Sequence, residues 1–142
     1  MGKKSAEIAT LLRVQGWNVD EQRRMLGQMM AREDALLADR RRLDEELLNE
    51  QKVAAANPTV AGHAYAGYAF NHKERVAVME RVIDALRAEI EQQRERLAEA
   101  YRELKVLEEV QANWKKKEDA EAARIEQAMM DEIAQNNHRL KV

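Results

Sequence analysis

Apolar residues recur every three or four positions along two long stretches of the chain. In the second stretch the repeat runs from Val76 to Trp114, and ten of its twelve positions are apolar. A period near 3.5 residues keeps one face of a helix turned toward a partner helix, so the pattern predicts a coiled coil. The twelve positions of this seam are Val76, Met79, Ile83, Leu86, Ile90, Gln93, Leu97, Ala100, Leu104, Leu107, Gln111 and Trp114.

The N-terminal stretch repeats the pattern, with eight apolar residues at twelve seam positions. Glu33 and Arg40 occupy two of them, which leaves two interpretations open. Either these side chains pack their alkyl parts and extend their charges to water, or a register shift gives their places to Met30 and Leu37. The positions are Ile8, Leu12, Gln15, Val19, Gln22, Leu26, Met29, Glu33, Leu36, Arg40, Leu43 and Leu47.

Between the two stretches lies the segment "NPTVAGHAYAGYAFN", residues 57–71, which contains the only proline. Proline restricts the residue before it, so the first helix ends there. Asn57 can cap a new helix with Pro58 at its first position, and the second helix therefore begins at Pro58 or only after Gly67. Neither helix buries its apolar seam alone. The sequence predicts an all-α protein, a long antiparallel two-helix coiled coil or helical hairpin.

We expect one coiled-coil domain over residues 1–142. The first arm is expected at about 6–55, the turn and its aromatic tip at about 56–71, and the second arm at about 67–135. The polar residues 136–142 are expected to fray. Because the second arm is the longer one, part of it should project or pack against another partner.

Charge and composition exclude several functional classes. The net charge is -2 with both signs interspersed, whereas nucleic-acid binders show a basic excess, so we expect no nucleic-acid partner. The basic run 115–117 is either a solvated face or a contact for an acidic protein. There is no cysteine, and no apolar run approaches the roughly 20 residues that span a bilayer. We expect a cytoplasmic protein without membrane insertion.

Catalytic and metal-binding motifs are also missing from the sequence. There is no phosphate-binding glycine-rich loop and no pair of Cys or His at metal-ligand spacing. Ser5 is the only serine and lies near one end of the chain. His63 and His72 flank the aromatic segment, but they lack a nearby pair of carboxylates. We therefore expect no enzymatic activity, no cofactor and no metal.

The few aromatic residues are the best candidates for binding surfaces. Trp114 lies on the seam and is expected in the core, whereas Trp17 lies off the seam, where an exposed tryptophan favours an interface. Tyr65, Tyr68 and Phe70 lie at the predicted turn. They either pack over the end of the hairpin or form a binding tip.

Two segments of the chain resemble the flagellar export protein FliJ family. One is "LKVLEEVQANWKKKEDAEAARIEQAMMDEIA", from Leu104, which is similar to the C-terminal arm of that family; the other is "LLRVQGWNVDEQRRMLG", which is similar to its opening. The length and the two-helix layout also fit. The matching residues are Leu12, Arg13, Val19, Asp20, Glu21, Arg24, Leu26, Leu107, Glu109, Val110, Glu126, Gln127, Asp131 and Glu132.

The resemblance implies a non-enzymatic component of the flagellar type III protein export apparatus. Members of the family are antiparallel coiled coils similar to the central stalk of rotary ATPases. The implied partners are the hexameric export ATPase, the membrane export gate and substrate chaperones, and the implied location is the cytoplasm, peripheral to the flagellar base at the inner membrane. The alternative is a structural coiled-coil protein that self-associates, as a homodimer, through the unmatched part of its second arm.

The stalk analogy also implies two sets of binding residues. The end that carries both termini would meet the ATPase ring, and the end with Tyr65, Tyr68 and Phe70 would be left for the export gate. The candidate ATPase-binding residues are Leu12, Arg13, Trp17, Asp20, Arg24, Trp114, Lys116, Glu126 and Ile133.

Overall fold

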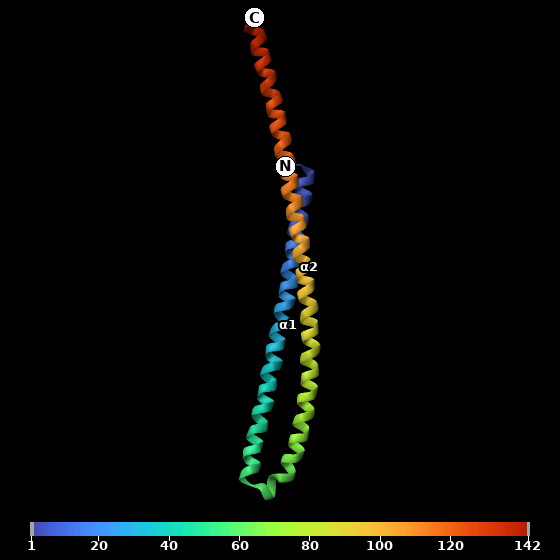
Figure 1. The fold of residues 1–142 in the computed structure, drawn as a ribbon, viewed down its shortest axis with the longest axis vertical. Helices are drawn as coiled ribbons and strands as arrows, with labels where there is room; N and C mark the ends of the chain where they lie inside the picture. The colour runs from blue at the N-terminus through green and yellow to red at the C-terminus, as the bar shows by residue number, and fades with distance from the viewer. Residues whose placement is uncertain (1, 142) are drawn as a thin grey trace. The chain divides into compact units, whose positions relative to one another are not determined.

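The computed structural model describes residues 2–141, except for the side chains of residues 60 and 61, and contains two helices over that range. Helix α1 spans Lys3–Ala56 and helix α2 spans Pro58–Lys141. The two helices pack against each other as a helical hairpin (Figure 1). The predicted fold class is confirmed.

The turn between the helices is much shorter than the sequence analysis predicts. Asn57 alone is non-helical, and its backbone N–H donates to the carbonyl of Val53 at 3.3 Å at the end of α1. Pro58 then opens α2, the earlier of the two expected starts, because its fixed φ suits the first helical position and its missing N–H costs nothing there. Residues 58–71, expected at the tip, are therefore the first turns of α2.

At its other end α2 continues to Lys141, past the expected end near residue 135. Residues 136–141 are thus helical in the structure, and their fraying in solution stays a prediction. Positions 1 and 142 lie outside the described residues. The contacts divide the chain into two compact units, Met1–Val19 with Glu99–Val142 (the terminal unit) and Asp20–Ala98 (the turn unit). The single domain over residues 1–142 stays a prediction.

In the turn unit, the predicted seam forms the core. Leu43, Ile83, Leu86 and Ile90 are buried, and Gln93 has no exposed surface. Contacts across the two helices pair rising numbers on α1 with falling numbers on α2, which makes the pairing antiparallel. These contacts join Gln22 to Gln93, Glu33 to Arg87, Arg40 to Glu80 and Asp44 to His72.

Glu33 and Arg40 keep their seam positions, as the first of the two interpretations predicts. Both are half-buried; of the two residues of the other interpretation, Met30 is 41% exposed and Leu37 is half-buried. Each charge lies against an opposite charge of the other helix. The Arg87 Nε is 3.1 Å from Glu33 Oε2, and the Arg40 guanidinium is 2.7 Å from Glu80 Oε1. These two ion pairs explain how charged residues fit in an otherwise apolar seam.

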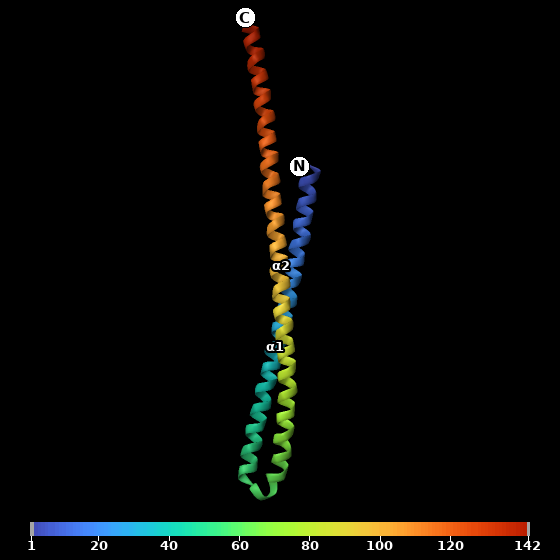
Figure 2. The same ribbon diagram turned by 45° about the vertical axis from the view of Figure 1, so that its right-hand side comes forward.

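The terminal unit has a smaller core of the same kind. Ile8, Val19 and Ala100 are buried, and Gln15 Nε2 donates to the carbonyl of Ala100 at 2.9 Å. Gln111 is exposed, unlike the other eleven seam positions of α2. Every residue from 119 to 141 is also exposed, and α1 does not run beside this part of α2 (Figures 1 and 2). We call residues 119–141 the C-terminal segment.

Candidate binding surfaces

A hydrogen-bonded cluster of three residues joins the start of α1 to α2 in the terminal unit. The hydroxyl of Ser5 donates to Glu118 Oε1 at 2.5 Å, and the indole Nε1 of Trp114 donates to the same oxygen at 2.7 Å. Trp114 is half-buried on the seam, as predicted, so its ring contributes to packing while its N–H is paired. We call Ser5, Trp114 and Glu118 the end cluster.

The end cluster favours the charged form of its carboxyl group. The hydrogen bond from Ser5 lowers the pKa of Glu118 most, and the bond from Trp114 lowers it further, against a smaller opposing effect of desolvation. Both donors bind the carboxylate more strongly than the neutral acid. Glu118 is therefore ionised at neutral pH, and it marks the last place where α1 covers α2, because every residue after it is exposed.

Trp17 is the most prominent exposed aromatic residue of the terminal unit. It is 62% exposed, and the guanidinium carbon of Arg13 lies 5.9 Å from the centre of its ring. A cation over the face of an indole holds the ring in a defined position at modest energetic gain. The predicted exposure of Trp17 is confirmed. Leu12, by contrast, is half-buried at its seam position.

The C-terminal segment carries an apolar stripe that no part of α1 covers. Ile125 is 48% exposed, Met129 59%, Ile133 57% and Leu140 85%. Glu126 is exposed within the same segment, and Lys116 is exposed just before it. Apolar residues gathered on one uncovered helix face are typical of a surface that binds another protein.

The candidate ATPase-binding residues are divided between the two units. Lys116 and Ile133 are separated by about 25 Å along α2, at 1.5 Å per residue. Arg24 and Asp20 belong to the turn unit, and Arg24 forms an ion pair with Glu21 of its own helix. That hydrogen bond lowers the pKa of Glu21 and raises the pKa of Arg24. The grouping of these residues as a single surface stays a prediction.

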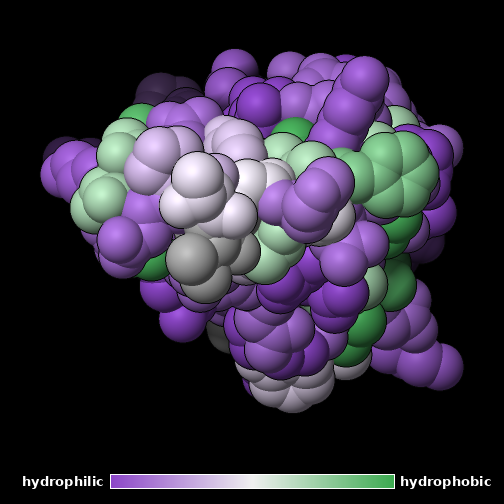
Figure 3. Space-filling view, turned by 90° about the horizontal axis from the view of Figure 1, so that it is seen from below, coloured by the Kyte–Doolittle hydropathy of each residue, from purple (hydrophilic) through white to green (hydrophobic). Residues whose placement is uncertain are grey.

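Near the turn, the three predicted tip residues differ in exposure. Tyr65 and Tyr68 are half-buried, whereas Phe70 is 65% exposed. Desolvation raises the pKa of Tyr68 most, and the nearby carboxylates of Glu46 and Glu50 raise it further. Tyr68 therefore packs toward α1. Figure 3 looks onto the turn end and shows hydrophobic residues next to hydrophilic ones. Among the three tip residues, Phe70 alone is exposed, and it offers a large apolar group.

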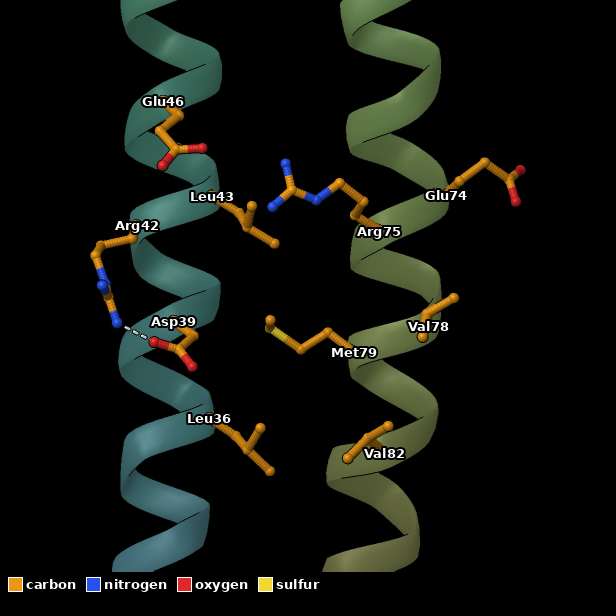
Figure 4. Close-up of a pocket in the computed structure, with 10 residues that line it drawn as sticks. All are labelled: Leu36, Asp39, Arg42, Leu43, Glu46, Glu74, Arg75, Val78, Met79 and Val82. Carbon is orange, nitrogen blue, oxygen red and sulfur yellow. Dashed lines mark hydrogen bonds and ion pairs between the residues drawn. The ribbon is translucent and has the colours of Figure 1, made fainter.

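The turn unit also contains a groove of about 580 Å³ that the sequence analysis did not predict. In Figure 4 the side chains of Leu36, Leu43 and Met79 point into the space between the helices. Val78 and Val82 add an exposed apolar edge on α2, at 50% and 40% exposure. Val78 and Val82 are four residues apart and lie off the main seam. This spacing was the sequence signal that could have predicted the groove. Charged residues border the groove, among them the ion pair of Asp39 and Arg42.

The described residues offer little for a metal ion. In residues 2–141 no three His, Cys, Asp or Glu side chains converge. His63 is exposed, whereas the side chain of His72 is only 11% exposed and its Nε2 lies 3.5 Å from Asp44 Oδ1. Across the part of the chain that the structure describes, neither helix has an apolar stretch that could cross a membrane.

Comparison with known proteins supports the resemblance seen in the sequence. A protein-family model described as "Flagellar FliJ protein" matches residues 4–142. No curated protein and no solved structure matches the chain. The family match covers nearly the whole chain, including both helices.

Proposed function

This chain belongs to the flagellar FliJ protein family and is a component of the flagellar export apparatus, and from this premise we propose that it acts as a non-enzymatic stalk and adaptor. It binds the hexameric export ATPase and couples that ATPase to the export gate and to substrate chaperones. The family match over residues 4–142 is the observation that carries the proposal. The location that follows is the cytoplasm at the flagellar base, peripheral to the inner membrane.

The terminal unit supplies the proposed ATPase-binding surface. Trp17 is exposed and oriented by Arg13, and an exposed tryptophan beside an arginine has the composition of an interface hot spot. Glu126 and Ile133, on the uncovered face of α2, and the basic Lys116 add charged and apolar contacts. Charged groups around apolar anchors favour fast and reversible docking.

The turn unit supplies the proposed contact with the export gate. Phe70 is the anchor, because Tyr65 and Tyr68 are half-buried and Phe70 is largely exposed. The groove beside Val78 and Val82 combines apolar side chains with charged ones, and its proposed occupant is an amphipathic helix of a chaperone.

Affinity measurements on single variants test the assignment of these surfaces. The Trp17→Ala variant is expected to bind the purified export ATPase of the same organism at least about tenfold more weakly, because a hot-spot tryptophan contributes about 2 kcal/mol or more. Val106→Ala is the matched control, since Val106 is an exposed apolar residue of the terminal unit outside the proposed surface. Phe70→Ala should leave ATPase affinity unchanged and weaken binding to the cytoplasmic part of the gate. Equal ATPase affinity for Trp17→Ala and Val106→Ala would reject the proposed surface.

A further inference from the structure

The apolar stripe of the C-terminal segment has a symmetric spacing. The positions on this face are Ala122, Ile125, Met129, Ile133, the polar Asn136 and Leu140, and the first five are separated by intervals of three, four, four and three residues. The sequence of intervals is the same when it is read from either end, and Met129 lies at its centre. Two copies of this segment placed antiparallel about Met129 would therefore match position for position, as the partners of an isologous contact do.

The stripe continues the face by which α2 already packs on α1. Trp114 and Glu118 are the last half-buried positions of α2, and steps of four and three residues lead from them to Ala122 and Ile125. Residues at these intervals share one face of a helix. This face is covered by α1 up to Glu118 and is uncovered beyond it. A partner helix on the C-terminal segment would extend an existing helix–helix interface.

Charges along the segment favour an antiparallel partner over a parallel one. Glu121 and Arg139 lie on the same flank of the stripe, eight and ten residues from Met129, and Glu121 already pairs with Arg124 of its own helix at 2.6 Å. In an antiparallel pair centred on Met129, Glu121 of one copy and Arg139 of the other are offset by only about 3 Å along the helix axes. In a parallel pair the two residues would be about 27 Å apart along the helices. The acidic start of the segment would also lie against its own acidic counterpart in the parallel case.

We propose that the C-terminal segment pairs antiparallel with the C-terminal segment of a second copy of this chain. Met129 lies on the two-fold axis, and Ile125 of each copy packs beside Ile133 of the other. Glu121 and Arg139 form an ion pair across each flank. The apolar part of the contact is short, so monomer and dimer exchange readily.

The pairing has a consequence that rests on the proposed function. Glu126 and Ile133 belong both to the pairing segment and to the proposed ATPase-binding surface. A second copy of the chain and the ATPase therefore cannot bind this surface at the same time. The dimer is then a form of the free protein in which this surface is covered, and binding to the ATPase separates the two copies of the chain.

Molecular mass measured against concentration by sedimentation equilibrium, without any ATPase, tests the pairing itself. The wild-type chain should rise from its monomer mass of 16.4 kDa toward twice that value. Ile133→Asp should stay monomeric over the same range, because it places a charge in the apolar contact. Ala134→Asp is the control, since Ala134 is the next residue but points away from the stripe, and it should dimerise like the wild type.

A charge exchange tests the direction of the pairing. Arg139→Glu should weaken the dimer several-fold, and the double variant Glu121→Arg with Arg139→Glu should restore it, because the flank pair is then re-formed with reversed signs. A wild-type chain that stays monomeric, an Ile133→Asp variant that still dimerises, or a double variant weaker than Arg139→Glu alone would overturn the proposal. All of these results are obtained without ATPase, so they test the pairing alone, and Trp17→Ala tests ATPase binding separately.

Discussion

Gln93 shows how a single polar residue fits within the seam. It has no exposed surface, and its Nε2 donates to the backbone carbonyl of Gln22 at 3.0 Å and to Gln22 Oε1 at 2.7 Å. Its own Oε1 is buried and has no hydrogen-bond partner among the described residues. A buried acceptor without a partner lowers stability, whereas the paired amide fixes the register of the two helices.

We predict that Gln93→Leu raises the free energy of unfolding by about 1 kcal/mol. The change removes the unpaired acceptor and adds apolar contact, while the half-exposed Gln22 can turn to water. Urea denaturation at a fixed protein concentration measures the difference. Gln111→Leu makes the same change at an exposed seam position and should stay within about 0.5 kcal/mol of the wild type. A loss of stability in Gln93→Leu of more than about 1 kcal/mol would show that its hydrogen bonds outweigh the unpaired oxygen.

The end cluster predicts a pH dependence of stability. Because the pKa of Glu118 is lowered in the folded chain, mainly by the hydrogen bond from Ser5, its contribution is fully present above the glutamate pKa of the unfolded chain. That ordinary value is about 4.3, and the contribution is lost as the pH falls through the lower pKa of the folded state. Ser5→Ala should therefore melt below the wild type at pH 7, with a difference that shrinks on acidification below about pH 4.

Thr10→Ala is the control for this experiment. The hydroxyl of Thr10 donates to the carbonyl of Ala6 in its own helix, which does not titrate, so the effect of Thr10→Ala should not change with pH. Thermal melts followed by circular dichroism give both differences. A Ser5→Ala difference that is the same at pH 7 and at pH 3 would mean that the bond to Glu118 does not stabilise the carboxylate.

On the scale of the helices, most of the fold follows from the sequence. Period and composition identify both helices and their seams, and Asn57-Pro58 identifies the turn. The length of the turn was less predictable, because helix-forming alanines follow Pro58 and only the structure shows that the helix survives Gly62 and Gly67. Gln111 fits the repeat and is nevertheless exposed. A repeat predicts which face of a helix a residue lies on, but it does not predict whether the other helix covers that residue.

Contacts between the helices could not be predicted, because they depend on the register in which α1 meets α2. The end cluster joins residues 113 positions apart, and the ion pair of Glu33 with Arg87 joins residues 54 apart. The candidate binding residues came from the family resemblance and from the exposure expected for Trp17. Periodicity predicted that part of α2 has an uncovered apolar face. It could not predict the residue at which that face begins, because this depends on how far α1 overlaps α2.

Exchange of the Arg40–Glu80 charges tests the register of the turn unit. Arg40→Glu should cost about 1 kcal/mol of stability, because it sets two carboxylates face to face across the helices. Adding Glu80→Arg should recover part of the loss, with a coupling energy of about 0.5 kcal/mol, since both side chains are more than one third exposed. Arg42→Glu is the control, because Arg42 pairs with Asp39 of its own helix and should not be rescued by Glu80→Arg. Equal rescue of both variants would reject the cross-helix pair.

On the scale of the whole molecule, each of the two units presents large exposed apolar groups on its surface. The terminal unit presents Trp17 and the uncovered face of α2, and the turn unit presents Phe70 and the groove beside Val78. The chain is a component of the flagellar export apparatus, and we propose that it acts there by binding other proteins. The central claim is therefore that its binding changes the activity of the export ATPase.

The most direct test is ATP hydrolysis by the export ATPase of the same organism, measured while this protein is titrated in. The account predicts a rise in rate that saturates at one copy per ATPase hexamer, and a weaker rise at equal concentration for Trp17→Ala. A rate that stays constant while no binding is detected would contradict the stalk function, and saturation at one copy per ATPase subunit would contradict a single copy at the ring axis.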